Sequence, residues 1–374
     1  MNVQQNVKEC VIRYYVTYNM ILKNNSIFSD YIIILRENEE KKMKKKTQKL
    51  LSVLLVTVLI TGLLAGCGKS ATSKKTGTSE ELTPMTIAFC TWAGYAPLYI
   101  AIEKGYFKEL GYDAKVVIME DESTYGAALV SNSVQALGQV LDRDIIQYDA
   151  GAPEQYVCTM DASTGGDGLI ATADIKSMDD LAGKTVALDK SATSYFFFLQ
   201  ALADSNITED QINIVEMGND EAGEAFLSGN VDAAVTWEPA LTNCTQREGG
   251  HILISSKDYP KAIIDVLTVN SNFLKDYPDA ADALNDCWNK SVEYLKSNPE
   301  DAYQIMADGL GLTADDVKSE CAGITFYDQD KNKSFNDLTT DQNVEDIAQM
   351  AADFWIEKGY MKKNDVSGFF NYLK

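Results

Sequence analysis

Residues 85–111 read MTIAFCTWAGYAPLYIAIEKGYFKELG, and this stretch decides the class of fold. Residues 85–90 are apolar and β-prone, so they predict a buried strand. Residues 96–110 carry apolar side chains at helical spacing, and Gly111 is a typical signal for the end of a helix. A strand, a loop and a helix in this order form the repeating unit of α/β proteins whose strands are mainly parallel.

The same alternation continues along the chain. Strands are predicted at residues 114–119, 136–140, 155–160, 183–188, 212–217 and 231–236, and helices from about 123 and at 191–205 and 221–228. Further helices are predicted at 280–297, 301–309, 314–323 and 344–358. The pattern predicts an α/β fold, and 374 residues suffice for two domains or one two-lobed domain.

The composition excludes several kinds of chemistry. The chain has one histidine, His251, whereas the common zinc and paired-histidine sites need at least two. A serine or cysteine mechanism would depend on His251 alone, and we expect this residue to lie in an exposed loop. The formal net charge of −22 argues against a nucleic-acid partner, which clustered basic residues would have to hold. We therefore expect no metal and no cofactor.

The N-terminal region has the layout of a secretory signal. Residues 43–66 begin with Met-Lys-Lys-Lys, continue with an apolar run and end in small residues. The 16-residue run 50–65 is shorter than the roughly 20 residues that span a membrane, although a short transmembrane anchor is the alternative. We predict that 43–66 is a signal peptide, that residues 1–42 lie upstream of the true start, and that 67–83 form a tether.

The sequence Leu-Ala-Gly-Cys at 64–67 resembles the bacterial lipobox. The resemblance implies that Cys67 carries acyl chains such as palmitate and becomes the mature N-terminus, so the protein would be anchored to the membrane by lipid. The five cysteines beyond it show no short spacing, so they give no zinc or redox motif, and their pairing stays open. They are Cys90, Cys158, Cys244, Cys287 and Cys321.

Aromatic side chains mark two loops that follow predicted strands, where α/β sheets present ligands. Trp92 and Tyr95 flank a glycine and can offer a stacking face, or they can simply pack the next helix onto the sheet. Trp237 and Glu238 combine a stacking ring with a hydrogen-bond acceptor. Pro239 at the start of a helix is the simpler explanation for part of that motif.

Hydroxyl groups dominate a third such loop. Thr193, Ser194 and Tyr195 lie at the predicted start of a helix, where side chains and free N–H groups can hold an anion or merely cap the helix. The glycine-rich bend at 161–168 lacks the lysine of a phosphate loop. Asp142 follows a predicted strand and, from its position alone, would be a solvated charge.

Several of these motifs together resemble one family. Residues 92–99, WAGYAPLY, and 103–107, EKGYF, are similar to the opening of substrate-binding proteins of nitrate/sulfonate/taurine ABC transporters. Further similar stretches follow in the same order, at 165–169, 180–187, 229–239 and 269–274. The resemblance covers about residues 85–374.

This resemblance implies a two-lobed periplasmic-binding fold of type II, each lobe a mainly parallel sheet flanked by helices. Lobe one would comprise residues 84–168 plus 269–374, and lobe two residues 169–268. The chain would cross between lobes near 168–171 and return near 265–270.

The resemblance also implies a function. An extracytoplasmic lipoprotein, monomeric and not an enzyme, would capture a small organic nutrient, sulfonate- or taurine-like or related, and pass it to an ABC permease and its ATPase. A receptor for a thiamine-precursor pyrimidine or another heterocycle is the alternative. A thiamine-pyrimidine-synthase-like enzyme is disfavoured because His251 is misplaced and no cysteine cluster exists.

The resemblance further implies which residues face the solute. From lobe one these would be Trp92, Tyr95 and Asp142, and near the hinge Ser163 and Thr164. From lobe two they would be Thr193, Ser194, Tyr195, Asp220, Trp237 and Glu238. Acidic residues outnumber basic ones in these loops, which favours a zwitterion or a neutral ring with an amino group over a small anion such as nitrate.

Overall fold

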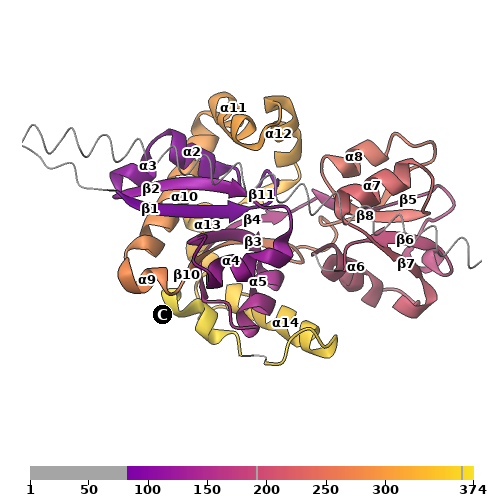
Figure 1. Cartoon of the computed structure of the whole chain (residues 1–374). Helices are drawn as coiled ribbons and strands as arrows, with labels where there is room; N and C mark the ends of the chain where they lie inside the picture. Colours follow the sequence, from indigo (N-terminus) through magenta and orange to yellow (C-terminus); the bar gives the residue numbers. More distant parts are fainter. Residues whose placement is uncertain (1–81, 191–192, 364) are drawn as a thin grey trace, which may run out of the picture. The chain divides into compact units, whose positions relative to one another are not determined.

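Two β-sheets with flanking helices build the described part of the chain (Figure 1). The computed structural model describes residues 82–190, 193–363 and 365–374. The predicted signal peptide, the segment upstream of it, the lipid anchor Cys67 and the tether up to residue 81 lie outside the described residues.

The larger sheet, sheet A, has the strand order β11-β4-β10-β3-β1-β2. Strand β1 is parallel to β2 and β3, while β10 is antiparallel to its neighbours β3 and β4. Four of its six strands therefore run in one direction, and β10 and β11 run against them. The bounds are β1 Thr83–Phe89, β2 Tyr112–Ile118, β3 Ala136–Val140, β4 Glu154–Ser163, β10 Ile264–Asn270 and β11 Ile324–Phe326.

The smaller sheet, sheet B, has the order β7-β6-β8-β5-β9. Only β5 runs against the other strands of this sheet. The bounds are β5 Asp167–Ala171, β6 Thr185–Leu188, β7 Asn213–Glu216, β8 Ala233–Trp237 and β9 His251–Ser255. The predicted α/β class with two sheets of mostly parallel strands is confirmed.

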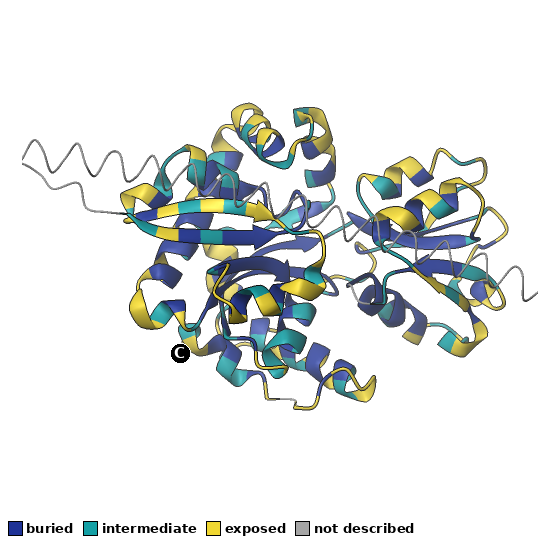
Figure 2. Ribbon diagram, viewed as in Figure 1, coloured by how far each residue is buried: buried dark blue, intermediate teal, exposed yellow. Residues whose placement is uncertain are grey.

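Helices cover both faces of sheet A, because alternate side chains of a strand point to opposite faces. Ile87 and Phe89 of β1 belong to the apolar cluster of α2 and α10, whereas Ala88 belongs to that of α4. The central strands are accordingly buried on both faces (Figure 2). The helices associated with this sheet are α2 Pro97–Glu103, α3 Tyr106–Glu109, η1 Glu122–Thr124, α4 Tyr125–Val130, α5 Leu141–Asp149, α9 Phe273–Asp276, α10 Ala280–Ser297, α11 Pro299–Leu310, α12 Ala314–Cys321, α13 Gln329–Phe335, α14 Val344–Glu357 and η4 Ser367–Leu373.

Sheet B is covered in the same way. Leu169 and Val235 share a cluster with α6, while Ile170 and Ala234 share one with α7 and α8. The cluster of α6 also includes Trp355 of α14, whose ring centroid lies 5.7 Å from that of Phe196. The helical segments of this part are η2 Met178–Leu181, α6 Thr193–Ala203, η3 Glu209–Gln211, α7 Asn219–Leu227 and α8 Ala240–Cys244.

The chain passes from sheet A to sheet B within residues 164–166 and returns within residues 256–263. These two connections are bonded to each other, because Ser256 Oγ lies 2.7 Å from Ser163 Oγ and accepts from Gly165 N at 2.8 Å. Gly166 is packed closely, since a Cβ there would lie 2.7 Å from Trp92 Cη2.

Two predictions about local structure were wrong. The helix expected at 96–110 is broken into α2 and α3, because Gly105 between them adopts a left-handed conformation (φ 76°) that a continuous helix does not allow. His251 is half-buried and begins β9, paired with Ala171, so it is not an exposed loop residue. Strand β9 therefore begins one residue before the apolar run that follows His251.

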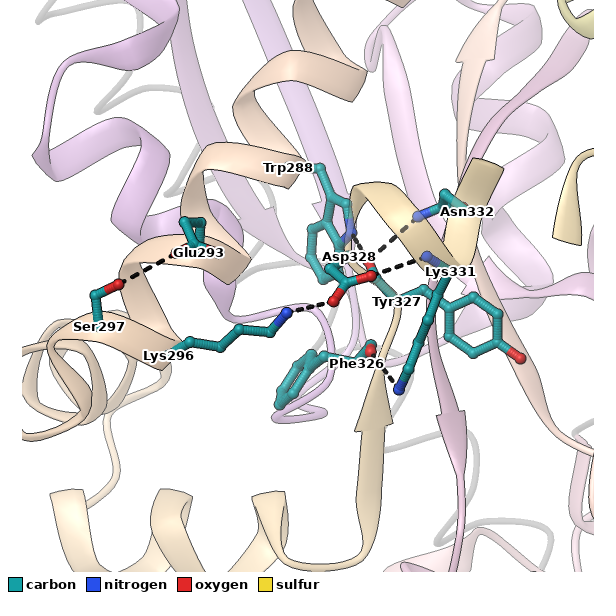
Figure 3. Close-up of polar contacts among 9 residues, drawn as sticks. All are labelled: Trp288, Glu293, Lys296, Ser297, Phe326, Tyr327, Asp328, Lys331 and Asn332. Atoms are coloured by element: carbon teal, nitrogen blue, oxygen red, sulfur yellow. Dashed lines mark hydrogen bonds and ion pairs between the residues drawn. The ribbon is translucent and has the colours of Figure 1, made fainter. Parts of the chain in front are cut away.

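The C-terminal helices are fixed to sheet A by polar contacts (Figure 3). Asn332 of α13 accepts from the backbone N–H of Thr159 at 2.9 Å and donates to its carbonyl at 2.8 Å. Trp288 of α10 donates to the carbonyl of Tyr327 at 2.9 Å, and Lys296 forms an ion pair with Asp328. These bonds hold β11 and α13 against α10.

The five cysteines within the described ranges are unpaired thiols, and all except Cys321 are buried. They therefore act as small apolar core residues. Within those same ranges, no group of three or more histidine, cysteine or acidic side chains is arranged to hold a metal ion. No helix among the described residues is both long and apolar enough to cross a membrane.

Candidate functional site

A pocket lies where elements of both sheets meet. Four residues predicted from the sequence line it: Trp92, Tyr95, Thr193 and Trp237. Six others were not predicted: Cys90, Glu122, Val140, Asp167, Ile263 and Asp265.

The loop after β1 forms one wall of the pocket. The Trp92 indole N–H donates to Asp161 Oδ1 at 3.4 Å, and the Tyr95 hydroxyl donates to Asp265. Both rings are buried, so they pack the loop and line the pocket at the same time. Gly94 is required between them, because a Cβ there would lie 2.2 Å from Asp161 Oδ2 and 2.3 Å from Trp92 Nε1.

Buried carboxyl groups lie in and next to the pocket lining. Asp161 of β4 and Asp265 of β10 are directly paired across the two strands, and both are almost fully buried. Burial raises the pKa of Asp161 to about 7 and that of Asp265 well above its usual range, and the neighbouring Asp161 raises the latter further. Two carboxyls in such contact cannot both ionise at low cost, so they share a proton near neutral pH.

Two further acids line the pocket from other elements. Asp167 begins β5, and its burial raises its pKa to about 7. Glu122 lies in η1, where burial raises its pKa while hydrogen bonds from Cys90 and Gln139 and attraction to Arg143 oppose that rise. The lining thus holds three carboxyl groups, and no lysine, arginine or histidine of the described residues belongs to it.

Asp142 is not the solvated charge expected from its position in the sequence. Only 3% of its surface is exposed, and burial raises its pKa to about 6. It accepts hydrogen bonds from Thr193 Oγ1 at 3.2 Å and Trp355 Nε1 at 3.1 Å. Asp142 therefore lies behind the pocket, where it positions Thr193 and ties α5 to α14.

The remaining residues predicted for lobe two point elsewhere. The Ser194 hydroxyl donates to the carbonyl of Asp189 at 3.2 Å, and the Tyr195 hydroxyl donates to Glu209 at 2.9 Å. Asp220 is exposed in the first turn of α7. Glu238 accepts from the Thr242 backbone N–H at 3.0 Å and its hydroxyl at 2.6 Å, so its carboxylate caps α8.

Ser163 and Thr164 lie at the first connection between the sheets and not in the pocket lining. Ser163 is buried against Ser256, and Thr164 donates its N–H to the carbonyl of Gly323 at 2.8 Å. One signal could have revealed a missed residue: Asp265 is the only charged side chain in the strand sequence IDVLTVN, in which every residue is buried. A charge within a buried strand usually needs a specific partner or role.

Comparisons with known proteins bear on the fold and the family. The profile of the NMT1/THI5-like family matches residues 92–302. A protein of Bacillus subtilis (strain 168), whose given name is that of an aliphatic sulfonates-binding protein, is 26% identical over 321 residues, covering 84% of this chain and 92% of that protein.

Solved structures agree at the level of the fold. The periplasmic aliphatic sulphonate binding protein SsuA of Escherichia coli matches with a TM-score of 0.63 and 18% identity, over 75% of this chain and 89% of that one. The periplasmic nitrate-binding protein NrtA of Synechocystis PCC 6803 matches with a TM-score of 0.59 and 17% identity, over 78% and 85%.

Proposed function

The chain belongs to the NMT1/THI5-like family, and from this premise we propose that it is an extracytoplasmic receptor that captures a small organic solute and delivers it to an ABC permease. The observation that carries the proposal is the pocket, which gathers aromatic and polar side chains from both sheets. The relatives support a solute-binding role, since they are named as binding proteins.

Solute capture follows from where the lining residues originate. Trp92, Tyr95 and Asp265 belong to elements of sheet A, whereas Thr193 and Trp237 belong to elements of sheet B. A solute that contacts both sets favours the arrangement in which they face each other. Rotation would take place at the two bonded connections, 164–166 and 256–263, so Ser163 and Thr164 would lie at the hinge.

We assign the two lobes to the two sheets. Residues 84–168 plus 269–374 would form lobe one and residues 169–268 lobe two, with the boundaries moved by a few residues to the two connections. Cys67 would carry the lipid that keeps the monomeric receptor near its permease and ATPase. Radiolabelled palmitate should then be incorporated into the full-length chain and not into a Cys67→Ala variant, and equal labelling of the two would contradict the anchor.

The class of solute separates two versions of the proposal. Relatives named for sulfonate or nitrate binding favour a sulfonate- or taurine-like solute, whereas the aromatic and acidic lining suits an amino-substituted heterocycle. The lining combines three carboxyl groups with aromatic and apolar side chains. Both a neutral ring and a zwitterion are compatible with this combination.

Native mass spectrometry of the purified full-length chain tests the proposal. We expect a retained small molecule, or a thermal shift with one compound of a panel of sulfonates, amines and pyrimidines, since a ligand of the folded state stabilises it. Trp92→Ala and Trp237→Ala should each abolish the shift while folding is retained. A protein that retains nothing and responds to no compound would contradict a receptor function.

A further inference from the structure

We propose that the pocket recognises a positively charged nitrogen of its solute, a protonated amine or amidine, and holds it with Glu122, Asp167 and Asp265 beside the rings of Trp92 and Trp237. This inference rests on the proposed function and narrows its solute to an organic cation or a zwitterion bound through its cationic group.

The three carboxyl groups reach the pocket from separate elements. Glu122 comes from η1, Asp167 from the start of β5 and Asp265 from the middle of sheet A, so their convergence is a property of the tertiary structure. Asp167 and Asp265 are at least nine-tenths buried. Buried carboxylates are stable only when paired, and the lining contains no cationic side chain among the described residues to pair with them.

The hydrogen-bond donors to these carboxyls are neutral. Asp265 accepts from the Tyr95 hydroxyl, Glu122 from the Cys90 thiol and the Gln139 amide, and Asp167 from the Ser163 hydroxyl. Neutral donors orient a carboxyl group without cancelling its charge, so a cation in the pocket can pair with each of these groups in its ionised form.

A further acid lies beside the lining. Asp161 is fully buried and does not belong to the lining, but it is paired with Asp265 across β4 and β10. Its Oδ2 lies 2.2 Å from the position that a Cβ on Gly94 would occupy, in the loop that forms the pocket wall. Asp161 therefore adds a second buried carboxyl next to Asp265, and a cation bound at Asp265 would interact with both.

Arg143 is the cation whose charge acts on Glu122, but it is not a lining residue. Its guanidinium carbon lies 6.0 Å from the centroid of the Trp355 ring, on α14 behind the pocket. It also attracts Asp142, so one positive charge is divided between two acids. The remaining lining acids, Asp167 and Asp265, receive no such attraction among the causes that shift their pKa.

The aromatic rings suit the same chemistry. The faces of tryptophan and tyrosine rings attract cations, most strongly where water is excluded. Trp92 and Tyr95 are almost fully buried, and Trp237 is half-buried at the end of β8. An anionic solute would face both these rings and three acids at once, whereas a cation is attracted by each of them.

Three compounds with the same ring and different head groups test the proposal. Benzamidine carries a positive charge, benzamide is its neutral counterpart, and benzenesulfonate is negative. Isothermal titration of the full-length chain at pH 8 should give benzamidine at least a tenfold lower Kd than either of the others. Because this comparison uses the unaltered protein, it does not depend on whether a variant folds.

Variants then locate the effect. Glu122→Gln, Asp167→Asn and Asp265→Asn should each raise the Kd for benzamidine at least tenfold. Glu154→Gln is the matched control, because Glu154 is a buried acid of sheet A that does not line the pocket. The Kd of this variant for benzamidine should stay within twofold of that of the unaltered protein. Taurine serves as the zwitterion probe, and its affinity should fall with the three lining variants.

The outcomes separate this inference from the proposed function. Tighter binding of benzenesulfonate than of benzamidine would overturn the cation site, and so would an affinity for taurine that the three lining variants leave unchanged. The receptor function would still stand in either case if Trp237→Ala abolishes that binding. If no compound binds and no solute is retained on purification, the receptor function itself is overturned.

Discussion

The hydroxyl of Tyr95 donates a hydrogen bond to Asp265 and so joins the loop after β1 to strand β10, 170 residues further along the chain. Both residues line the pocket and both are buried. Asp265 is in turn paired with Asp161 of β4. The wall of the pocket is therefore part of the core of sheet A, and changes there should affect stability and binding together.

Tyr95→Phe should lower the free energy of unfolding by about 1–3 kcal/mol, because it leaves the buried Asp265 carboxyl without this donor. Urea denaturation at pH 7 measures the loss. Tyr277→Phe is the control, since its side chain is 37% exposed, and its effect should stay within about 0.5 kcal/mol. Equal stability of the Tyr95→Phe variant and the unaltered protein would show that the bond does not contribute.

Trp237→Ala should weaken solute binding, whereas Glu238→Ala should lower stability, although the two residues are neighbours in the chain. Trp237 lines the pocket, so its loss should weaken solute binding at least tenfold. Glu238 caps α8, so its loss should lower stability by about 1 kcal/mol and leave the Kd within twofold. Titration calorimetry and thermal unfolding of both variants decide this, and a large loss of affinity in Glu238→Ala would place its carboxylate in the site.

Stability should fall as the pH rises from 5 to 8. The pKa values of Asp161 and Asp167 are raised to about 7 in the folded protein, against about 4 in an unfolded chain. The folded state then binds more protons in this interval, and linkage requires that ionising these groups destabilises it. Exposed acids with lowered pKa values, such as Asp174 and Asp301, act in the opposite direction only below about pH 4.

Urea midpoints at several pH values measure this slope. Asp161→Asn should make it shallower, since an amide does not ionise, whereas Asp301→Asn should leave it unchanged between pH 5 and 8. A midpoint that rises over this interval would contradict the raised pKa values. A cationic solute should bind more tightly at pH 8 than at pH 5 for the same reason.

Asn332→Ala should lower the free energy of unfolding by about 2–4 kcal/mol, because both backbone groups of Thr159 lose their partner inside the protein. Thermal unfolding measures the change. Lys331→Ala is a suitable control on the same helix, since Lys331 is exposed and its loss should cost no more than about 0.5 kcal/mol. Equal effects of the two variants would mean that α13 is held by apolar packing alone.

Periodicity in the sequence was sufficient for most elements. The helix predicted at 280–297 coincides with α10, and the strand at 136–140 with β3, because their apolar patterns are uninterrupted and their ends are marked. The helix predicted at 96–110 failed at Gly105, where one residue with a left-handed backbone starts a second helix. The spacing of apolar residues shows which face of an element is buried, but it does not show where one residue changes the direction of the backbone.

The sequence by itself determined the α/β class and the aromatic part of the candidate site, since Trp92 follows β1, Trp237 ends β8, and strand ends are where such sheets bind ligands. Only the tertiary structure decided which acids join them. Asp167 and Asp265 are far apart in the chain and become neighbours through the pairing of β4 with β10 and the crossing to β5, and Glu122 joins them from η1. Which charged side chains line a pocket depends on their distances in space, and these distances cannot be read from their spacing along the chain.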